Sequence, residues 1–269
     1  MNDAEQRIIS IIRDYIEAVE AELNSRWENW HVDLSEAEMY EVIGALLARM
    51  VSLATEMALA PQIWNEHIAP IILRSMADAY ISLAWIFEVP LERSRKYILF
   101  GLGQAKLGIE YRKAQLEEDG LLADEDPIIK ATESWINLQR YIFLTEVKLG
   151  SWSDLTTRNM ADEAGCIDFY NYVYSPFSAA THNVWHHIGR YNLRLCTNPL
   201  HGIHFVPADL SLDRHNDYLR LAAKYVQNAF DLFDKKTGVA IQTLSAFEEL
   251  SKSLDGLKET TNPKEDEVQ

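Results

Sequence analysis

Residues 35–59 read SEAEMYEVIGALLARMVSLATEMAL, and the pattern of this stretch decides the fold class. Its apolar side chains recur every three or four residues, at Val42, Ile43, Leu46, Leu47, Met50, Leu53 and Met57. That spacing places them on one face of a helix, whereas a half-buried strand would alternate at every second residue. Ser35 and Glu38 have the spacing of a capping box, so the sequence predicts a helix over 36–59.

Helical spacing also fills the segments on either side of this stretch. Prolines and glycines separate the segments, because proline lacks an amide hydrogen and glycine favours helix ends. Asp126 before Pro127, and Ser153, are residues of the types that cap helix starts. We therefore expect further helices over 3–30, 70–88, 90–118, 127–148, 154–163, 167–195, 212–233 and 238–257, and an interruption of the helix over 167–195 near Pro176 is left open.

The predicted fold class is all-α, a single irregular antiparallel bundle of about seven to ten helices over residues 1–257. Residues 196–210 are expected to form a loop, in which the strand-like fragment Ile203–Val206 is too short to build a sheet. Residues 258–269 are polar and acidic and have almost nothing apolar to bury. We therefore expect a disordered tail from residue 258 onward.

Composition and charge narrow the possible functions. The chain has 269 residues, of which 48% are hydrophobic, and a formal net charge of −16. This charge argues against broad binding of duplex nucleic acid, but it leaves room for a local basic site for a single RNA strand. The two cysteines, Cys166 and Cys196, have no metal-type spacing and fit a reducing cytosol. We expect a cytoplasmic protein without a membrane partner, because Arg74 and Asp78 interrupt the most apolar segment, Ile71–Val89.

Arg74 and Asp78 lie four residues apart on the otherwise apolar helix predicted over 70–88. A charged pair is costly to bury unless its members are paired and hydrogen-bonded. Two interpretations follow. The pair is a structural tie to a neighbouring helix, or it forms the floor of a pocket in which Arg74 offers a planar fork to a phosphate or carboxylate.

The second polar set lies in Tyr170–Arg190, where Ser178, His182 and His186 recur every four residues and so share one face of a continuous helix. Four interpretations are open. The first is that these side chains are hydrogen-bonded polar residues between packed helices, and the second is that His182 and His186 are two metal ligands, although no partner ligands are evident. The third is a serine activated by a histidine, although the glycine-flanked elbow of hydrolases is absent. The fourth is a histidine that acts as an acid or base near Arg74.

We expect the two polar sets to meet. The Arg74–Asp78 helix should pack directly on the Ser178–His182 helix, and the four side chains should share one pocket. Two polar lines that face each other can satisfy each other's hydrogen bonds, whereas two that face hydrocarbon cannot.

Arg74 and Asp78 together with Tyr174, Ser178 and His182 resemble the pattern of an uncharacterised all-helical bacterial family, domain-of-unknown-function family 5677. That family has an arginine and an acidic residue one turn apart on an apolar helix and a later Tyr-x3-Ser-x3-His run. The resemblance covers residues 40–235. Asp78 stands where the family pattern has glutamate. The resemblance implies a helical fold and names these residues, but it supplies no activity.

In helix content and in polar residues within the bundle, such proteins are also similar to the helical, HEPN-like ribonuclease toxins of phage defence. Those toxins use an Arg-x4–6-His motif without a metal. The literal match in this chain is Arg26 with His31, at the end of the first predicted helix. This weaker similarity implies ribonuclease-like activity in phage defence.

The first functional hypothesis is an enzyme that cleaves RNA or another phosphodiester without a metal or cofactor. His182 would be the general acid or base, and Arg74 would stabilise the charge that develops on the phosphate. Asp78 and Ser178 would orient these two groups, so all four are the candidate catalytic residues.

The second hypothesis is a binding module. Tyr174 and His186 would then help to hold a small anionic ligand, or the bundle would serve as a sensor that binds a protein partner in a defence system. The third hypothesis is a structural bundle whose buried polar residues only fix the register of its helices.

Overall fold

The computed structural model describes residues 3–31, 33–139, 151–201, 204–241 and 244–261. Within these ranges the regular secondary structure is helical apart from one short hairpin, so the predicted all-α class is confirmed. The longer helices are α1 (Asp3–Asn29), α2 (Ala37–Leu59), α3 (Ala69–Ile86), α4 (Pro90–Glu118), α10 (Asp217–Thr237) and α11 (Ala246–Thr261). The shorter ones are α5 (Pro127–Asn137), α6 (Thr157–Glu163), α7 (Ile167–Phe169), α8 (Ser175–Thr181) and α9 (Trp185–Tyr191).

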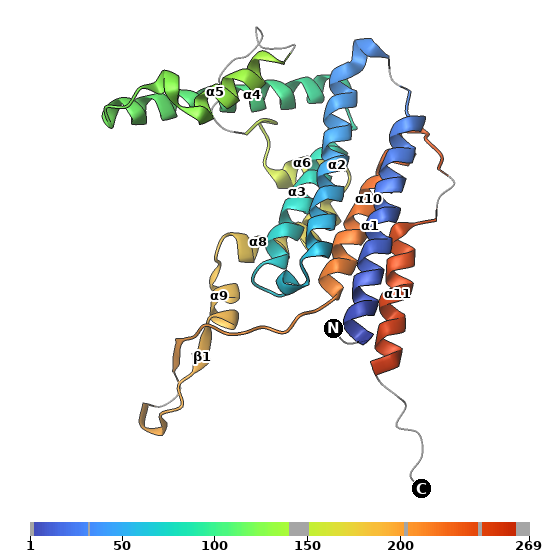
Figure 1. Cartoon of the computed structure of the whole chain (residues 1–269), viewed down its shortest axis with the longest axis vertical. Coiled ribbons are helices and arrows are strands. Elements are labelled where there is room, and N and C mark those ends of the chain that lie inside the picture. The colour runs from blue at the N-terminus through green and yellow to red at the C-terminus, as the bar shows by residue number, and fades with distance from the viewer. Residues whose placement is uncertain (1–2, 32, 140–150, 202–203, 242–243, 262–269) are drawn as a thin grey trace.

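Helices α1, α2, α3, α10 and α11 lie side by side as a bundle (Figure 1). Helices α4 and α5 extend sideways from one end of this bundle, and α9 with the hairpin extends away from the other end. Helix α3 takes a central place, because it packs against α2, α10, α6 and α8. This central place explains why α3 is apolar nearly all round, and it makes any charged residue on α3 unusual.

The main core is built from the apolar faces of α2, α3 and α10. Its fully enclosed side chains include Leu47, Met50, Leu73, Met76, Phe230 and Phe233. A smaller cluster holds α5 against α4, and it consists of Leu102, Ile109, Leu116, Ile129 and Ile136. By length and composition α2 is apolar enough to cross a membrane, but half of that stretch is buried inside the bundle, as in a core helix.

The capping box predicted at the start of α2 does not form. The Asp33 carboxylate accepts a hydrogen bond from the amide of Ser35 at 2.8 Å and starts a 3-10 turn, Leu34–Glu36, ahead of α2. Glu38 accepts a hydrogen bond from Arg95 Nε at 2.9 Å. Glu38 therefore ties α2 to α4, a contact between distant segments that a local motif cannot anticipate.

Two further predicted caps have opposite outcomes. The predicted cap at Ser153 is wrong, because α6 begins at Thr157 and its cap is Thr156. The Thr156 hydroxyl accepts a hydrogen bond from the Asn159 amide at 3.2 Å. The Asp126 cap is confirmed, because its carboxylate accepts from two backbone amides of the first turn of α5, at 3.0 Å each.

Several predicted helix ends are wrong. Helix α10 continues to Gly238, whose φ of 73° is left-handed and ends the helix, so α11 begins at Ala246 and not at 238. Helix α11 runs to Thr261, past the predicted start of the tail at 258, and residues 262–269 lie outside the described residues. Helix α5 ends at Asn137; the rest of the helix predicted to 148 falls largely on residues 140–150, which also lie outside them.

The helix expected over 167–195 is divided in the structure, first next to Pro176, where the sequence left an interruption open, and again after Thr181, where none was expected. Pro176 has no amide hydrogen to continue the α-helical ladder, and the turn before it, Tyr170–Tyr174, is π-helical. The chain breaks again after α8, where Asn183 adopts a left-handed φ of 52°. Ser178, His182 and His186 therefore do not lie on one face of one helix.

The end of that predicted helix and the loop after it form a hairpin. Strand β1 (Leu193–Leu195) pairs antiparallel with β2 (Phe205–Pro207), with Leu195 opposite Phe205. The predicted strand-like fragment overlaps β2. The expectation that this fragment is too short to build a sheet is wrong, because β1 supplies a partner strand and the two form a small two-stranded sheet.

Candidate functional site

Helix α3 packs directly on α8, as predicted, and the contact is made through polar side chains. Arg74 is buried on α3, with its side chain 9% exposed. Its Nε donates a hydrogen bond to the Ser178 hydroxyl at 2.7 Å, and its Nη1 pairs with the carboxylate of Asp78 one turn further along α3. The two polar sets therefore satisfy each other, which explains how an apolar helix can bury an arginine.

Besides Asp78 on α3 and Ser178 on α8, Arg74 contacts Tyr174 in the π-helical turn. The guanidinium carbon lies 3.2 Å from the centre of the Tyr174 ring, a cation–π contact. The Ser178 hydroxyl, which accepts from Arg74, donates to the Tyr174 carbonyl at 3.0 Å. The Tyr174 hydroxyl donates to Thr157 Oγ1 at 3.2 Å, which links the ring to α6. The guanidinium is thus held by a connected set of side chains and has one fixed position.

Asp78 faces a different environment from its partner. Its side chain is 50% exposed, whereas that of Arg74 is almost enclosed. Burial of the carboxyl raises the pKa of Asp78 above its usual value, and the positive charges of Arg74 and His182 offset part of this rise. Asp78 is therefore a solvent-reachable carboxyl that gains a proton more readily than a surface aspartate does.

Asp78 lines a cavity of about 600 Å³ between α2, α3, α4 and the segment 151–160. Among the described residues that line it, Asp78 is the one carboxylate and Arg49 is the one guanidinium. Hydroxyl and amide groups make up much of the rest of its polar lining, from Ser75, Ser82, Gln104, Ser151 and Thr157. Thr157 also accepts from Tyr174, so the cavity is continuous with the polar network around Arg74.

One wall of the cavity is aromatic. The Trp152 ring meets Tyr97 edge to face at 4.9 Å between centres, and it meets Trp85 in the same way at 5.3 Å. Phe100 adds a further ring to the lining. Burial raises the pKa of Tyr97, so its hydroxyl keeps its proton at neutral pH. The wall therefore offers flat apolar surfaces and hydrogen-bonding hydroxyls.

The structure brings together four of the predicted site residues, Arg74, Asp78, Tyr174 and Ser178. His182 is exposed at the end of α8, near enough for its charge to affect the pKa of Asp78.

His186 lies apart from these residues. It is exposed on α9, next to His187. Burial lowers the pKa of His187, and the charges of His67 and His186 lower it further. The predicted pocket thus contains no contribution from His186, because the break at Asn183 turns α9 onto a separate course.

Sequence reasoning missed the residues that complete the cavity. Arg49 on α2, Gln104 on α4 and Thr157 on α6 come from three distant segments. Arg49 and Gln104 are largely exposed, and no spacing rule separates them from other polar surface residues. Only the packing of α2 and α4 around α3 selects them.

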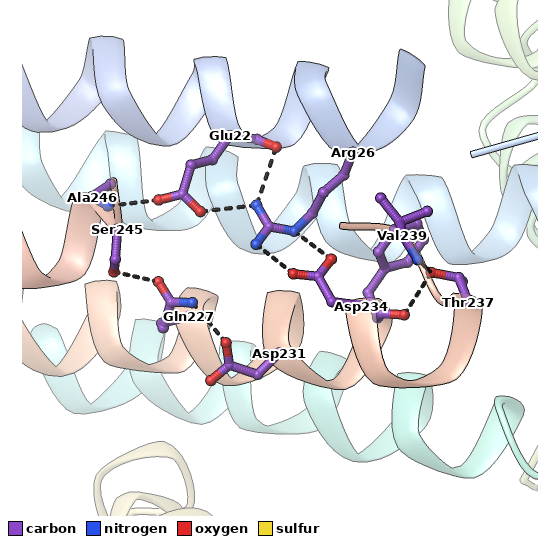
Figure 2. A network of polar contacts seen from close by, with 10 residues as sticks. Glu22, Arg26, Gln227, Asp231, Asp234, Thr237, Val239, Ser245 and Ala246 are labelled. Atoms are coloured by element: carbon purple, nitrogen blue, oxygen red, sulfur yellow. Dashed lines mark hydrogen bonds and ion pairs between the residues drawn. The ribbon is translucent and has the colours of Figure 1, made fainter. Parts of the chain in front are cut away.

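Arg26 and His31, which match the motif of the ribonuclease toxins, do not form a catalytic pair. Arg26 is 2% exposed, and it donates to the Glu22 carboxylate at 2.8 Å and to the Asp234 carboxylate at 2.9 and 2.8 Å (Figure 2). Glu22 in turn accepts from the amide of Ala246 at 2.6 Å. This network joins α1, α10 and α11, so Arg26 has a structural role, while His31 is exposed.

The fold and the site define a class: a helical bundle with a buried Arg–Asp pair beside a polar cavity. Residues 40–198 match the model of DUF5677, which is described as a family of unknown function. The match covers more than half of the chain, so the protein belongs to this family. It contains α3, α8 and all the lining of the cavity, and it ends before residue 235, where the resemblance was expected to end. None of the curated proteins and none of the solved structures matches the chain, and the comparisons give no support to the likeness to ribonuclease toxins.

Proposed function

We propose that this protein binds a small polar ligand in the cavity at Asp78. The observation that carries the proposal is the asymmetry of the ion pair. Arg74 is enclosed and fixed by three partners, whereas the Asp78 carboxyl opens onto the cavity with a raised pKa. A pair that served only to join helices would gain nothing from a half-open carboxyl. A volume of about 600 Å³ lies within the range of small-molecule sites.

The lining indicates the chemistry of the ligand. Asp78 accepts hydrogen bonds, the rings of Tyr97 and Trp152 suit a flat apolar group, and Arg49 suits an anionic group. A mononucleotide combines these three features in one molecule, and so does the end of a single RNA strand. We therefore propose a nucleotide as the ligand class.

The ribonuclease hypothesis is the second candidate, and one observation favours it: the charge of His182 acts on Asp78. Against it stand the exposure of His182 and the enclosure of Arg74 beneath Tyr174, because transition-state stabilisation needs donors that reach the reacting phosphate. A role as a ribonuclease effector in phage defence depends on the same hypothesis. Ligand binding without cleavage therefore accounts better for the geometry.

The test is thermal unfolding of the full chain with each of AMP, GMP, CMP and UMP. A ligand at about 100 times its Kd stabilises by about 2.7 kcal/mol, which for a protein of this size raises the Tm by about 5–10 °C. Asp78→Asn should abolish this rise. Asp162→Asn is the matched control, because it removes the same charge from an exposed position on α6 that does not line the cavity.

If no mononucleotide shifts the Tm, or if Asp78→Asn and Asp162→Asn respond alike, the proposal is wrong. Incubation with single-stranded RNA tests the second candidate in the same preparation. If the wild type cleaves the RNA and His182→Ala does not, the function of this site is catalysis and not ligand binding alone.

A further inference from the structure

The hairpin that extends from the bundle carries a second set of chemically active side chains. Leu195 pairs with Phe205 at the end of the two strands, and the next backbone hydrogen bond runs from the Cys196 amide to the His204 carbonyl at 2.9 Å. Cys196 therefore lies opposite His204. Side chains of residues that face each other across an antiparallel pair lie on the same side of the sheet, so the thiol and the imidazole are neighbours.

His201 completes the set. It ends a 3-10 turn, Pro199–His201, and its Nδ1 lies 3.7 Å from Cys196 Sγ. The far nitrogen of its ring, Nε2, contacts the Asn198 side-chain amide at 2.9 Å, which fixes the orientation of the ring. Potential ligand atoms of Cys196, His201 and His204 all lie within 4.8 Å of one another.

We propose that Cys196, His201 and His204 bind one Zn²⁺ ion. Bond lengths of about 2.3 Å to sulfur and about 2.0–2.1 Å to nitrogen place tetrahedral ligand atoms about 3.3–3.6 Å apart. The three side chains reach that geometry by small rotations from their present separations. One thiolate and two imidazoles form the donor set that Zn²⁺ prefers over the oxygen-seeking cations. The fourth position is left to water or to a further donor.

The stability of the hairpin supplies an independent reason. The strands have three residues each, and the side chains of Leu195 and Phe205 are 51% and 60% exposed. Neither residue belongs to the apolar clusters of the described chain. A hairpin of this length is marginal in water unless it packs on a core or is cross-linked. A bound metal ion supplies such a cross-link at the open end of the strands.

This inference does not rest on the proposed function. The hairpin extends away from the bundle at the end opposite to α4, whereas α4 forms part of the cavity (Figure 1). From the sequence, the two cysteines showed no metal-type spacing, and the histidine pair considered as metal ligands was His182 and His186, which lacked partners. The donors in this hairpin follow the spacing Cys-x4-His-x2-His, one cysteine followed by two histidines.

The test is titration of the full-length, tag-free and chelator-stripped protein with Co²⁺, followed by absorption spectroscopy. A thiolate ligand gives a charge-transfer band in the near ultraviolet, and four-coordination gives intense visible bands. Both should saturate at a single equivalent, and Zn²⁺ should then bleach them. Asp78→Asn should leave this spectrum unchanged.

Variants identify the ligands. Cys196→Ser should remove the charge-transfer band. His201→Ala and His204→Ala should each weaken Co²⁺ binding by at least about 10–100-fold, because even outer partners of metal ligands contribute that much. Cys166→Ser is the matched control, since burial raises the pKa of that thiol to about 11 and keeps it protonated. Circular dichroism should show unchanged helix content in all four variants.

Two results would overturn the proposal. One is a wild-type protein that binds Co²⁺ without a charge-transfer band, or does not bind it. The other is a band that survives Cys196→Ser and disappears in Cys166→Ser, because the thiolate would then come from the bundle.

Discussion

Among the residues that the structure describes, two buried arginines, Arg26 and Arg74, form ion pairs, and their replacement by alanine should separate a structural pair from the candidate site. The pair of Arg26 and Glu22 is the more enclosed of the two, because their side chains are only 3% and 2% exposed. The Arg26 guanidinium also donates to both carboxylate oxygens of Asp234 (Figure 2). The guanidinium carbon lies 4.0 Å from the centre of the Phe230 ring.

Arg26→Ala leaves the Glu22 carboxylate buried and charged, with the amide of Ala246 as a remaining donor. Loss of one partner from a buried ion pair costs about 3–5 kcal/mol. In a protein of this size each kcal/mol lowers the Tm by about 2–4 °C, so we expect a fall of roughly 6–20 °C. The urea midpoint should fall without a change in the slope of the transition.

Arg74→Ala should be milder in stability and more severe in function. Asp78 is 50% exposed, so it stays hydrated when its partner is removed. The loss is confined to the contact with Tyr174 and the hydrogen bond to Ser178, about 1–2 kcal/mol together. Nucleotide binding should nevertheless disappear, because Asp78 loses the group that fixes its position.

Urea denaturation followed by circular dichroism measures both variants. Arg13→Ala is the control, because its ion pair with Asp14 is exposed by 67% and 64%, and its loss should cost less than about 0.5 kcal/mol. Arg26→Met combined with Glu22→Met should recover part of the lost stability, since apolar side chains then replace the buried pair. If Arg26→Ala destabilises no more than Arg74→Ala, the distinction between the two pairs is wrong.

Two other predictions concern pH and backbone conformation. Because burial raises the pKa of Asp78, the folded state holds that proton more tightly than the unfolded chain, so stability should fall as pH rises from about 4 through the raised pKa. The Tm difference between wild type and Asp78→Asn should therefore change with pH in that window, and a constant difference would contradict the assignment. Gly238→Ala forces a side chain into a φ of 73° with no atom within 4 Å to clash, so it should cost about 1–2 kcal/mol from backbone strain alone. Its urea midpoint should fall, while Gly256→Ala in α11 should not lower it.

The positions of the long helices could be predicted because their apolar faces extend over many turns. Their ends could not, since they depend on contacts with other elements. Glu38 accepts a hydrogen bond from Arg95 on α4, which a local capping pattern does not anticipate, and α10 continues to Thr237, past the predicted end at 233, before Gly238 ends it. The meeting of Arg74 with Ser178 could be predicted for a stronger reason: a buried polar side chain on an apolar helix requires a partner.

Spacing along the chain indicates proximity only while the backbone conformation continues. Ser178, His182 and His186 would share a face in an unbroken helix, but the left-handed Asn183 separates α8 from α9, so the chemistry remains at Ser178 and Tyr174. Cys196 and His204 show the converse. They are eight positions apart in a segment predicted as a loop, and only the register of the hairpin places them opposite each other. In both cases the deciding quantity is the backbone conformation of a few residues between the functional groups, which composition and periodicity do not determine.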